Sequence, residues 1–134
     1  MRNRTALILS LVLITLPGCK KSGEDVLRGS YATTISHWHV PTLPEMVGPW
    51  EITFAQEGKY SVRRNGLLLI QGEYSVQGDT LRIFNETGVA ACTGQPPASY
   101  HWELTQDSLF LVKALETCPG REIILTTHPL VRKR

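Results

Sequence analysis

Between residues 50 and 127 the chain repeats one pattern, in which short runs alternate apolar and polar residues and turn residues separate the runs. Alternation with a period of two is typical of a strand with one buried face. Asn65-Gly66 is the clearest turn, because both central residues of a type I′ hairpin need a positive φ. Tight turns of this kind pair neighbouring strands antiparallel, so the sequence predicts an all-β fold.

The pattern predicts eight strands, over residues 30–38, 50–54, 60–63, 67–76, 80–84, 99–104, 108–113 and 121–127. Eight sequential antiparallel strands with one apolar face each can close into an up-and-down barrel, which leaves no exposed edge. A barrel of this size is just wide enough to be filled by side chains or to hold one small ligand. We therefore expect an eight-stranded antiparallel up-and-down barrel, with an open two-sheet sandwich as the competing fold.

The N-terminus has the pattern of a secretory signal, since two arginines precede an apolar run over residues 5–16. That run is shorter than the roughly 20 residues that span a bilayer. It leads into Leu16-Pro17-Gly18-Cys19, which resembles the bacterial lipobox, where a signal peptidase cuts before the cysteine and the cysteine sulfur carries diacylglycerol. We expect a signal peptide over residues 1–18 and lipidation of Cys19. The alternative is an uncleaved anchor helix with an incidental cysteine.

Lipidation would hold the domain at a membrane outside the cytoplasm, through a polar tether over residues 19–25. Lys20 stands where enterobacterial lipoproteins of the inner membrane carry aspartate, so the resemblance implies a cell-envelope protein of the outer membrane. Loss of the two arginines in the signal leaves twelve basic and twelve acidic residues. A formally neutral chain gives no support to a nucleic-acid partner. The basic residues 132–134 are expected to form a solvated tail.

The two remaining cysteines, Cys92 and Cys118, form an even pair in an oxidising compartment. We expect a structural disulfide between them, which closes a loop of about 25 residues. Two free thiols or a metal pair are the alternatives, but the close CxxC spacing of a zinc site is missing.

Several motifs are similar to those of bacterial lipocalin-like proteins. They are Gly29-Ser30-Tyr31, Gly48-Pro49-Trp50, Gly72-Glu73-Tyr74, Gly78-Asp79-Thr80-Leu81, Cys92, Tyr100-His101-Trp102 and Cys118-Pro119-Gly120-Arg121. The resemblance implies a calycin-type barrel domain over residues 26–131, in many members with an apolar cavity open at one end. In lipocalins a tryptophan near the closed end packs under an arginine from a late strand. The resemblance therefore implies that Arg121 closes the barrel against Tyr31 or Trp50.

The inward apolar residues predict either a ligand pocket or a filled core. The candidate ligand-binding residues are Trp50, Phe54, Tyr60, Ile70, Tyr74, Tyr100 and Trp102. An apolar pocket with a few tyrosine hydroxyls would suit a small hydrophobic ligand, whereas a filled core would bind nothing. Large aromatic residues argue for filling, while Gly72, expected on the same face as Leu68 and Tyr74, argues for space.

Motifs for metal binding and catalysis are weak. His37 and His39 could hold a metal ion together with a third ligand such as His101, but ordinary surface histidines are the favoured interpretation. The sequence contains no G-x-S-x-G motif and no glycine-rich phosphate loop. We expect neither an enzyme nor a cofactor.

Two classes of function remain. The first is a membrane-anchored lipoprotein that binds a small hydrophobic ligand inside the barrel. The second is an envelope interaction or inhibitor module with a filled barrel, as in lipoprotein inhibitors of lysozyme, which use a similar small disulfide-bearing barrel. The Pro-rich connection over residues 89–99 is the expected lid or recognition loop under either hypothesis.

Overall fold

The structure of the protein is a computed structural model, and it describes Gly18 and residues 21–134. The predicted signal peptide up to residue 17 and the predicted lipid site Cys19 lie outside the described residues. Among the residues that are described, none of the helices combines the length and the apolar composition of a membrane span.

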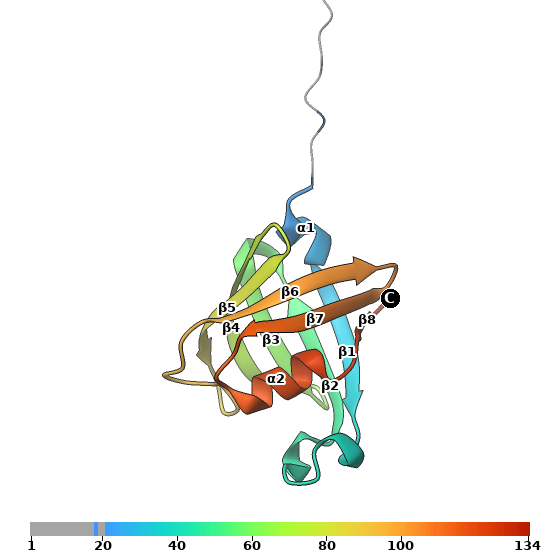
Figure 1. Ribbon diagram of the computed structural model, residues 1–134, viewed down its shortest axis with the longest axis vertical. Helices are drawn as coiled ribbons and strands as arrows, with labels where there is room; N and C mark the ends of the chain where they lie inside the picture. The colour runs from blue at the N-terminus through green and yellow to red at the C-terminus, as the bar shows by residue number, and fades with distance from the viewer. Residues whose placement is uncertain (1–17, 19–20) are drawn as a thin grey trace, which may run out of the picture.

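Eight antiparallel strands close into a barrel in sequential order (Figure 1). They are β1 (Gly29–Ile35), β2 (Gly48–Phe54), β3 (Lys59–Arg64), β4 (Leu67–Gln77), β5 (Thr80–Thr87), β6 (Ala98–Thr105), β7 (Ser108–Leu115) and β8 (Leu130–Arg132). The ring closes where Tyr31 of β1 lies opposite Arg132 of β8. The predicted all-β up-and-down barrel is confirmed, and the sandwich is not formed.

The prediction of a last strand over residues 121–127 is wrong. This segment lies in helix α2 (Pro119–Thr126), and the barrel is closed by β8 instead. Pro119 suits a first helical turn, because its fixed φ is helical and its missing N–H is not needed there. The run of apolar residues 123–125 is too short to separate helix from strand by periodicity. Arg132, expected in a solvated tail, consequently pairs within the barrel.

The short helices lie at the ends of the barrel. Helix α1 (Gly23–Leu27) packs against β4, and α2 packs against β7 and against the short helix over Pro44–Met46. Figure 1 shows α1 and α2 toward opposite ends. The described part of the chain also contains three single-turn helices, η1 (His37–His39), η2 (Pro44–Met46) and η3 (Gln56–Gly58). Ser22 caps α1 by accepting a hydrogen bond from the N–H of Asp25, so regular structure begins inside the predicted tether.

The predicted disulfide is confirmed. Cys92 and Cys118 are bonded, with 6.1 Å between their Cα atoms. Cys92 lies in the long connection from β5 to β6, and Cys118 is the residue that precedes α2. Beside the bond, the hydroxyl of Thr117 donates to the side-chain oxygen of Gln95 at 2.8 Å. The disulfide therefore fastens the β5–β6 connection to the start of α2.

Candidate functional site

The residues predicted to bind a ligand form the core of the barrel. Six of them are buried, namely Trp50, Phe54, Tyr60, Ile70, Tyr74 and Tyr100. The ring of Phe54 packs on three others, with centroid distances of 6.0 Å to Tyr31, 5.8 Å to Tyr60 and 5.1 Å to Tyr74. These rings occupy the interior space that a ligand would need. Their role in binding an apolar molecule stays a prediction.

Gly72 does not open space in this interior. A Cβ added at Gly72 would lie 3.1 Å from the carbonyl oxygen of Phe84 and 3.2 Å from Cγ of Glu86. The side chain of Glu86 thus lies directly beside the glycine and is buried. The glycine allows close packing here, which is the opposite of the space that its position in the sequence indicated.

Both ends of the barrel are covered. At one end the indole N–H of Trp50 donates to the carbonyl of Met46 at 2.8 Å, and the sulfur of Met46 lies next to Gly120 of α2. At the other end Gly23 of α1 lies against Val76 and Trp102. Trp102 is only half-buried, and its indole N–H donates to the carbonyl of Gly78 at 3.0 Å.

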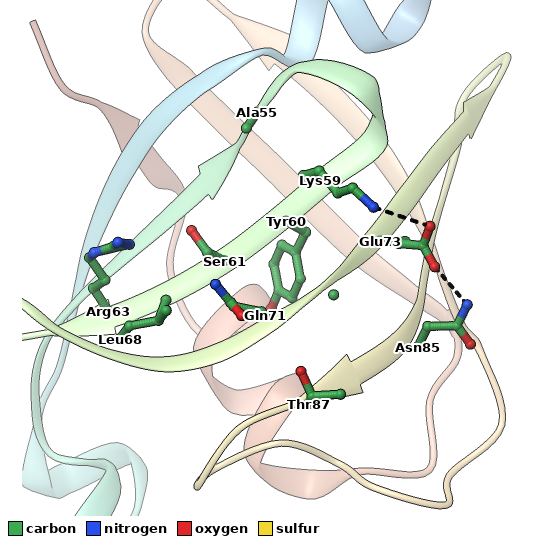
Figure 2. A pocket seen from close by; sticks show the side chains of 11 residues that line it. Ala55, Lys59, Tyr60, Ser61, Arg63, Leu68, Gln71, Glu73, Asn85 and Thr87 are labelled. Atoms are coloured by element: carbon green, nitrogen blue, oxygen red, sulfur yellow. Dashed lines mark hydrogen bonds and ion pairs between the residues drawn. The ribbon is translucent and has the colours of Figure 1, made fainter.

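A hollow of about 550 Å³ lies on the outer face of β3, β4 and β5 (Figure 2), and we call it the outer groove. Its lining residues are Ala55, Lys59, Tyr60, Ser61, Arg63, Leu68, Gln71, Gly72, Glu73, Asn85 and Thr87. Lys59, Ser61 and Arg63 alternate along β3 with the buried residues Tyr60 and Val62. The period of two therefore places these polar side chains outside the barrel.

Two strand irregularities lie at the outer groove. The register of β3 against β4 shifts between Val62 and Arg63, and that of β4 against β5 shifts between Gln71 and Glu73. Such bulges bend a strand and redirect side chains. The first one explains why Leu68, expected to point inward, is instead 41% exposed and lines the groove. A shift of one residue moves a side chain to the other face of the sheet.

Asn85 marks the second irregularity with a φ of 53°, a left-handed conformation that asparagine tolerates better than most residues. Its side-chain amide donates to Oε2 of Glu73 at 2.7 Å, and Nζ of Lys59 lies 3.6 Å from Oε1 of the same carboxylate. The hydrogen bond from Asn85 and, secondly, the charge of Lys59 hold the pKa of Glu73 below its ordinary value. Glu73 is therefore ionised at neutral pH and already has its partners.

Among the described residues, the remaining polar side chains of the outer groove form no hydrogen bonds or ion pairs with one another. Among the residues that the structure describes, Arg63 takes part in no ion pair. Its cross-strand neighbour on β2 is Glu51, whose carboxylate is bound by Lys133. Arg63 also borders a second hollow of about 270 Å³ on the side of β1 and β2. Sequence reasoning missed this site because outward polar residues on three strands look like an ordinary solvated face.

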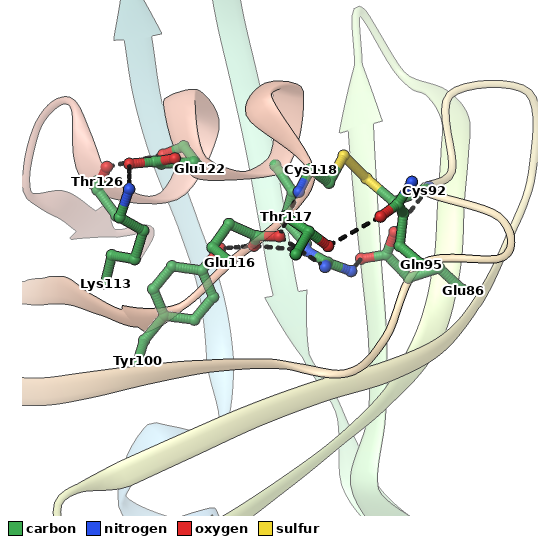
Figure 3. Close-up of polar contacts among 11 residues, drawn as sticks. Glu86, Cys92, Gln95, Tyr100, Lys113, Glu116, Thr117, Cys118, Glu122 and Thr126 are labelled. Carbon is green, nitrogen blue, oxygen red and sulfur yellow. Dashed lines mark hydrogen bonds and ion pairs between the residues drawn. A yellow bond between two sulfur atoms is a disulfide. The ribbon is translucent and has the colours of Figure 1, made fainter.

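The barrel also encloses a charged cluster, shown in Figure 3. Arg121 of α2 contacts Glu116 through two hydrogen bonds, from Nε at 2.7 Å and from Nη2 at 2.8 Å. Its Nη1 lies 3.0 Å from Oε1 of Glu86. The three side chains are at most 2% exposed. One guanidinium thus compensates two buried carboxylates.

Backbone and side-chain groups nearby also donate hydrogen bonds to these carboxylates. The backbone N–H of Cys92 donates to Glu86 at 3.1 Å, and that of Cys118 donates to Glu116 at 2.8 Å. The hydroxyl of Tyr100 also donates to Glu116. Burial by itself would raise the pKa of Glu116, but the hydrogen bonds from Arg121, Tyr100 and Cys118 outweigh it and leave that pKa below its ordinary value. The cluster therefore joins α2, β5, β6 and the disulfide.

The same environment acts on two tyrosines. Burial raises the pKa of Tyr60 and of Tyr100 far above the ordinary value, and the nearby carboxylates raise both further. In the unfolded chain both groups ionise near pH 10. Above that pH the unfolded state therefore binds fewer protons than the folded state, so stability falls as the pH rises.

We expect the urea midpoint of the protein to drop steeply between pH 9.5 and 11.5. Each such tyrosine contributes a slope of up to about 1.4 kcal/mol per pH unit. Denaturation curves across this pH range measure the slope, and Tyr100→Phe is the control because it removes one of the two groups. A Tyr100→Phe variant with an unchanged slope would contradict the assignment.

The predicted pairing of Arg121 with Tyr31 or Trp50 is replaced by two other contacts. The guanidinium of Arg132 lies 5.2 Å from the ring centre of Tyr31, and it donates to the Tyr31 hydroxyl at 2.6 Å. Arg64 lies 5.0 Å from the ring centre of Trp50. Both aromatic residues thus meet a cation, but Arg121 lies on a helix and turns to the two glutamates instead.

The histidines take ordinary positions. His39 packs edge-on against His128 with 4.5 Å between ring centres, and its Nδ1 is 2.6 Å from the hydroxyl of Ser36. Nδ1 of His101 lies 3.6 Å from Oδ2 of Asp79. Within residues 21–134 no group of three or more His, Cys, Asp or Glu side chains is arranged to hold a metal ion.

Comparison of the chain with protein-family models, curated proteins and solved structures finds no match. The barrel topology is compatible with a lipocalin-like fold.

Proposed function

We propose that this chain is a lipid-anchored, extracytoplasmic binding protein of the lipocalin-like kind, which is not an enzyme and acts through its outer surface. The observation that carries this proposal is the packing of the interior. Phe54 contacts three aromatic rings, helices cover both barrel ends, and the hollow of about 550 Å³ lies outside. These facts favour the interaction-module hypothesis over an apolar ligand inside the barrel.

Entry of an apolar ligand would require displacement of well-packed aromatic side chains. Removal of one buried phenylalanine side chain costs a protein about 3–5 kcal/mol, which indicates the scale of the packing that a ligand of similar volume must replace. The interior is also lined at its α2 end by the Arg121 cluster, and an apolar ligand cannot satisfy such charged groups.

The proposed anchor sets the position of the barrel. Four residue steps separate Cys19 from Gly23, where α1 begins, and a fully extended chain covers about 14 Å in that distance. A lipidated Cys19 would hold the barrel close to the outer membrane with its α1 end toward the lipid. The outer groove on β3 to β5 would then stay accessible from the periplasm or the cell surface.

Mass spectrometry of the intact protein tests the anchor. We expect protein extracted from membranes to begin at Cys19 and to carry the added mass of diacylglycerol and an acyl chain. The matched control is Cys19→Ala, which offers no thiol for lipid and is expected to show no such added mass. A membrane-associated wild-type chain that retains Met1 and carries no lipid would contradict the proposal.

Titration with an apolar fluorescent dye tests the filled interior. We expect no saturable binding by the mature protein, because Phe54 and its neighbours leave no space. Phe54→Ala is the positive control, since a cavity of this kind stays dry and accepts small apolar molecules; circular dichroism verifies that this variant is folded. Saturable uptake of dye or fatty acid by the unaltered protein would overturn the proposed use of the outer surface.

A further inference from the structure

We infer that the outer groove is a binding site for a sugar-like acid, meaning a compact polyhydroxylated molecule that carries a carboxylate or a phosphate. This inference rests on the proposed function, in which the outer surface is the working surface. It adds a specific site and a chemical class of ligand. The volume of about 550 Å³ lies within the range of small-molecule sites.

The groove is organised in three rows of side chains that run across the strands. In the first row Lys59 lies opposite Glu73, and Asn85 completes this row by its hydrogen bond to Glu73. The row is therefore satisfied internally and forms one wall of the site, as Figure 2 shows. Because Glu73 is fixed as a carboxylate, this wall also disfavours an anion at that end.

The second row consists of neutral polar groups. Ser61 lies opposite Gln71, and Gln71 lies opposite Thr87 in the next strand. Within the described residues, no side-chain hydrogen bond or ion pair connects any of these three to another residue, and all three line the groove. Two hydroxyls and an amide provide both donors and acceptors. Such a row matches the hydroxyl groups of a sugar-like ring.

The third row joins a cation to an apolar side chain. Arg63 lies opposite Leu68, and the half-exposed Leu68 offers an apolar surface for the C–H groups of a ring. The guanidinium of Arg63 has donors arranged for bidentate contact with carboxylate or phosphate. With Lys59 committed to Glu73, Arg63 is the group that selects an oxyanion. The second hollow continues beyond it, so a ligand longer than one ring can extend past Arg63.

Titration of the ¹⁵N-labelled mature protein in detergent micelles tests this inference by NMR. The probes are glucuronate, glucose 6-phosphate and neutral glucose, which share a ring and differ in charge. We expect at least one of the acids to shift amide signals of groove residues, with a dissociation constant on the order of 1 mM for such an open site. Glucose is expected to bind about tenfold more weakly or not at all.

Arg63→Gln is expected to weaken binding of the acid about tenfold or more. The matched control is Arg82→Gln, which removes an equally charged exposed arginine from β5, where Arg82 packs near Phe84 outside the groove. A response to glucuronate alone assigns a carboxylate, and a response to glucose 6-phosphate alone assigns a phosphate. Equal binding of glucose, or unchanged binding by Arg63→Gln, would overturn the inference.

The outcomes also separate this inference from the proposed function. If no probe shifts groove signals while the unaltered mature protein still excludes the apolar dye, the proposed ligand class is wrong. The proposed function of the outer surface then stands. If the unaltered protein takes up the dye, the outer-surface function fails whatever the groove binds.

Discussion

Replacing Arg121 by leucine is expected to lower the free energy of unfolding by about 3–5 kcal/mol. The substitution leaves Glu86 and Glu116 buried without their cation, and both side chains are at most 1% exposed. Two uncompensated carboxylates in this space repel each other and lack solvation. Urea denaturation at pH 7 measures the loss.

The control for this prediction lies on the same helix. Glu122 pairs with Lys113 at 2.7 Å, but both side chains are about a third exposed or more. Glu122→Gln is therefore expected to cost less than about 1 kcal/mol. Protonation offers a second check, because the penalty of Arg121→Leu should shrink when both carboxylates are neutral at low pH. A loss below 1 kcal/mol for Arg121→Leu at pH 7 would show that the cluster does not stabilise α2.

Removal of the disulfide is the change with the second-largest expected effect. The double variant Cys92→Ser, Cys118→Ser should lose about 3–4 kcal/mol, because the bond closes a loop with a sequence separation of 26 residues and restricts the unfolded chain. Urea denaturation of the variant and of the wild type with and without reductant provides the comparison. Reduced wild type and the double variant are expected to agree.

Hydrogen exchange can locate this loss. Both cysteine N–H groups donate to the carboxylates that hold Arg121, so loosening of the disulfide should reach α2 first. We expect amide exchange in α2 to accelerate more than exchange in β2, which lies among the buried aromatic rings. Equal acceleration in α2 and β2 would mean that the disulfide acts on the unfolded state alone.

The Arg121 and disulfide variants are not expected to be additive. Arg121, Glu116 and Cys118 lie within six residues and share hydrogen bonds, and residues in one network show coupling energies of about 0.5–3 kcal/mol. Combining both changes should therefore cost less than their sum. This coupling expresses the structural role of the cluster, which is to hold a helix over one end of the barrel.

Local patterns were enough to predict seven of the eight strands. The alternation of apolar and polar residues in β2 indicates a strand with one buried face, and Trp50, Ile52 and Phe54 are the buried residues. This pattern can be recognised from neighbouring residues alone. The Asn65-Gly66 turn ties β3 to β4 for the same reason, since its conformation depends on two residues. The disulfide followed from the count of cysteines. These features need no knowledge of distant parts of the chain.

Closure of the barrel decided the rest. Whether residues 119–126 form a helix, and whether Arg121 or Arg132 reaches Tyr31, depends on which segment fills the last gap beside β1. The outer groove depends on bulges that bring Arg63 opposite Leu68 and Gln71 opposite Thr87. The sequence by itself determined seven of the eight strands, the turns between them and the disulfide, because these depend on near neighbours or on the count of cysteines. Only the tertiary structure decided helix α2, the last strand β8, the buried charges and the groove, because each joins residues whose relative positions are set by the closed sheet.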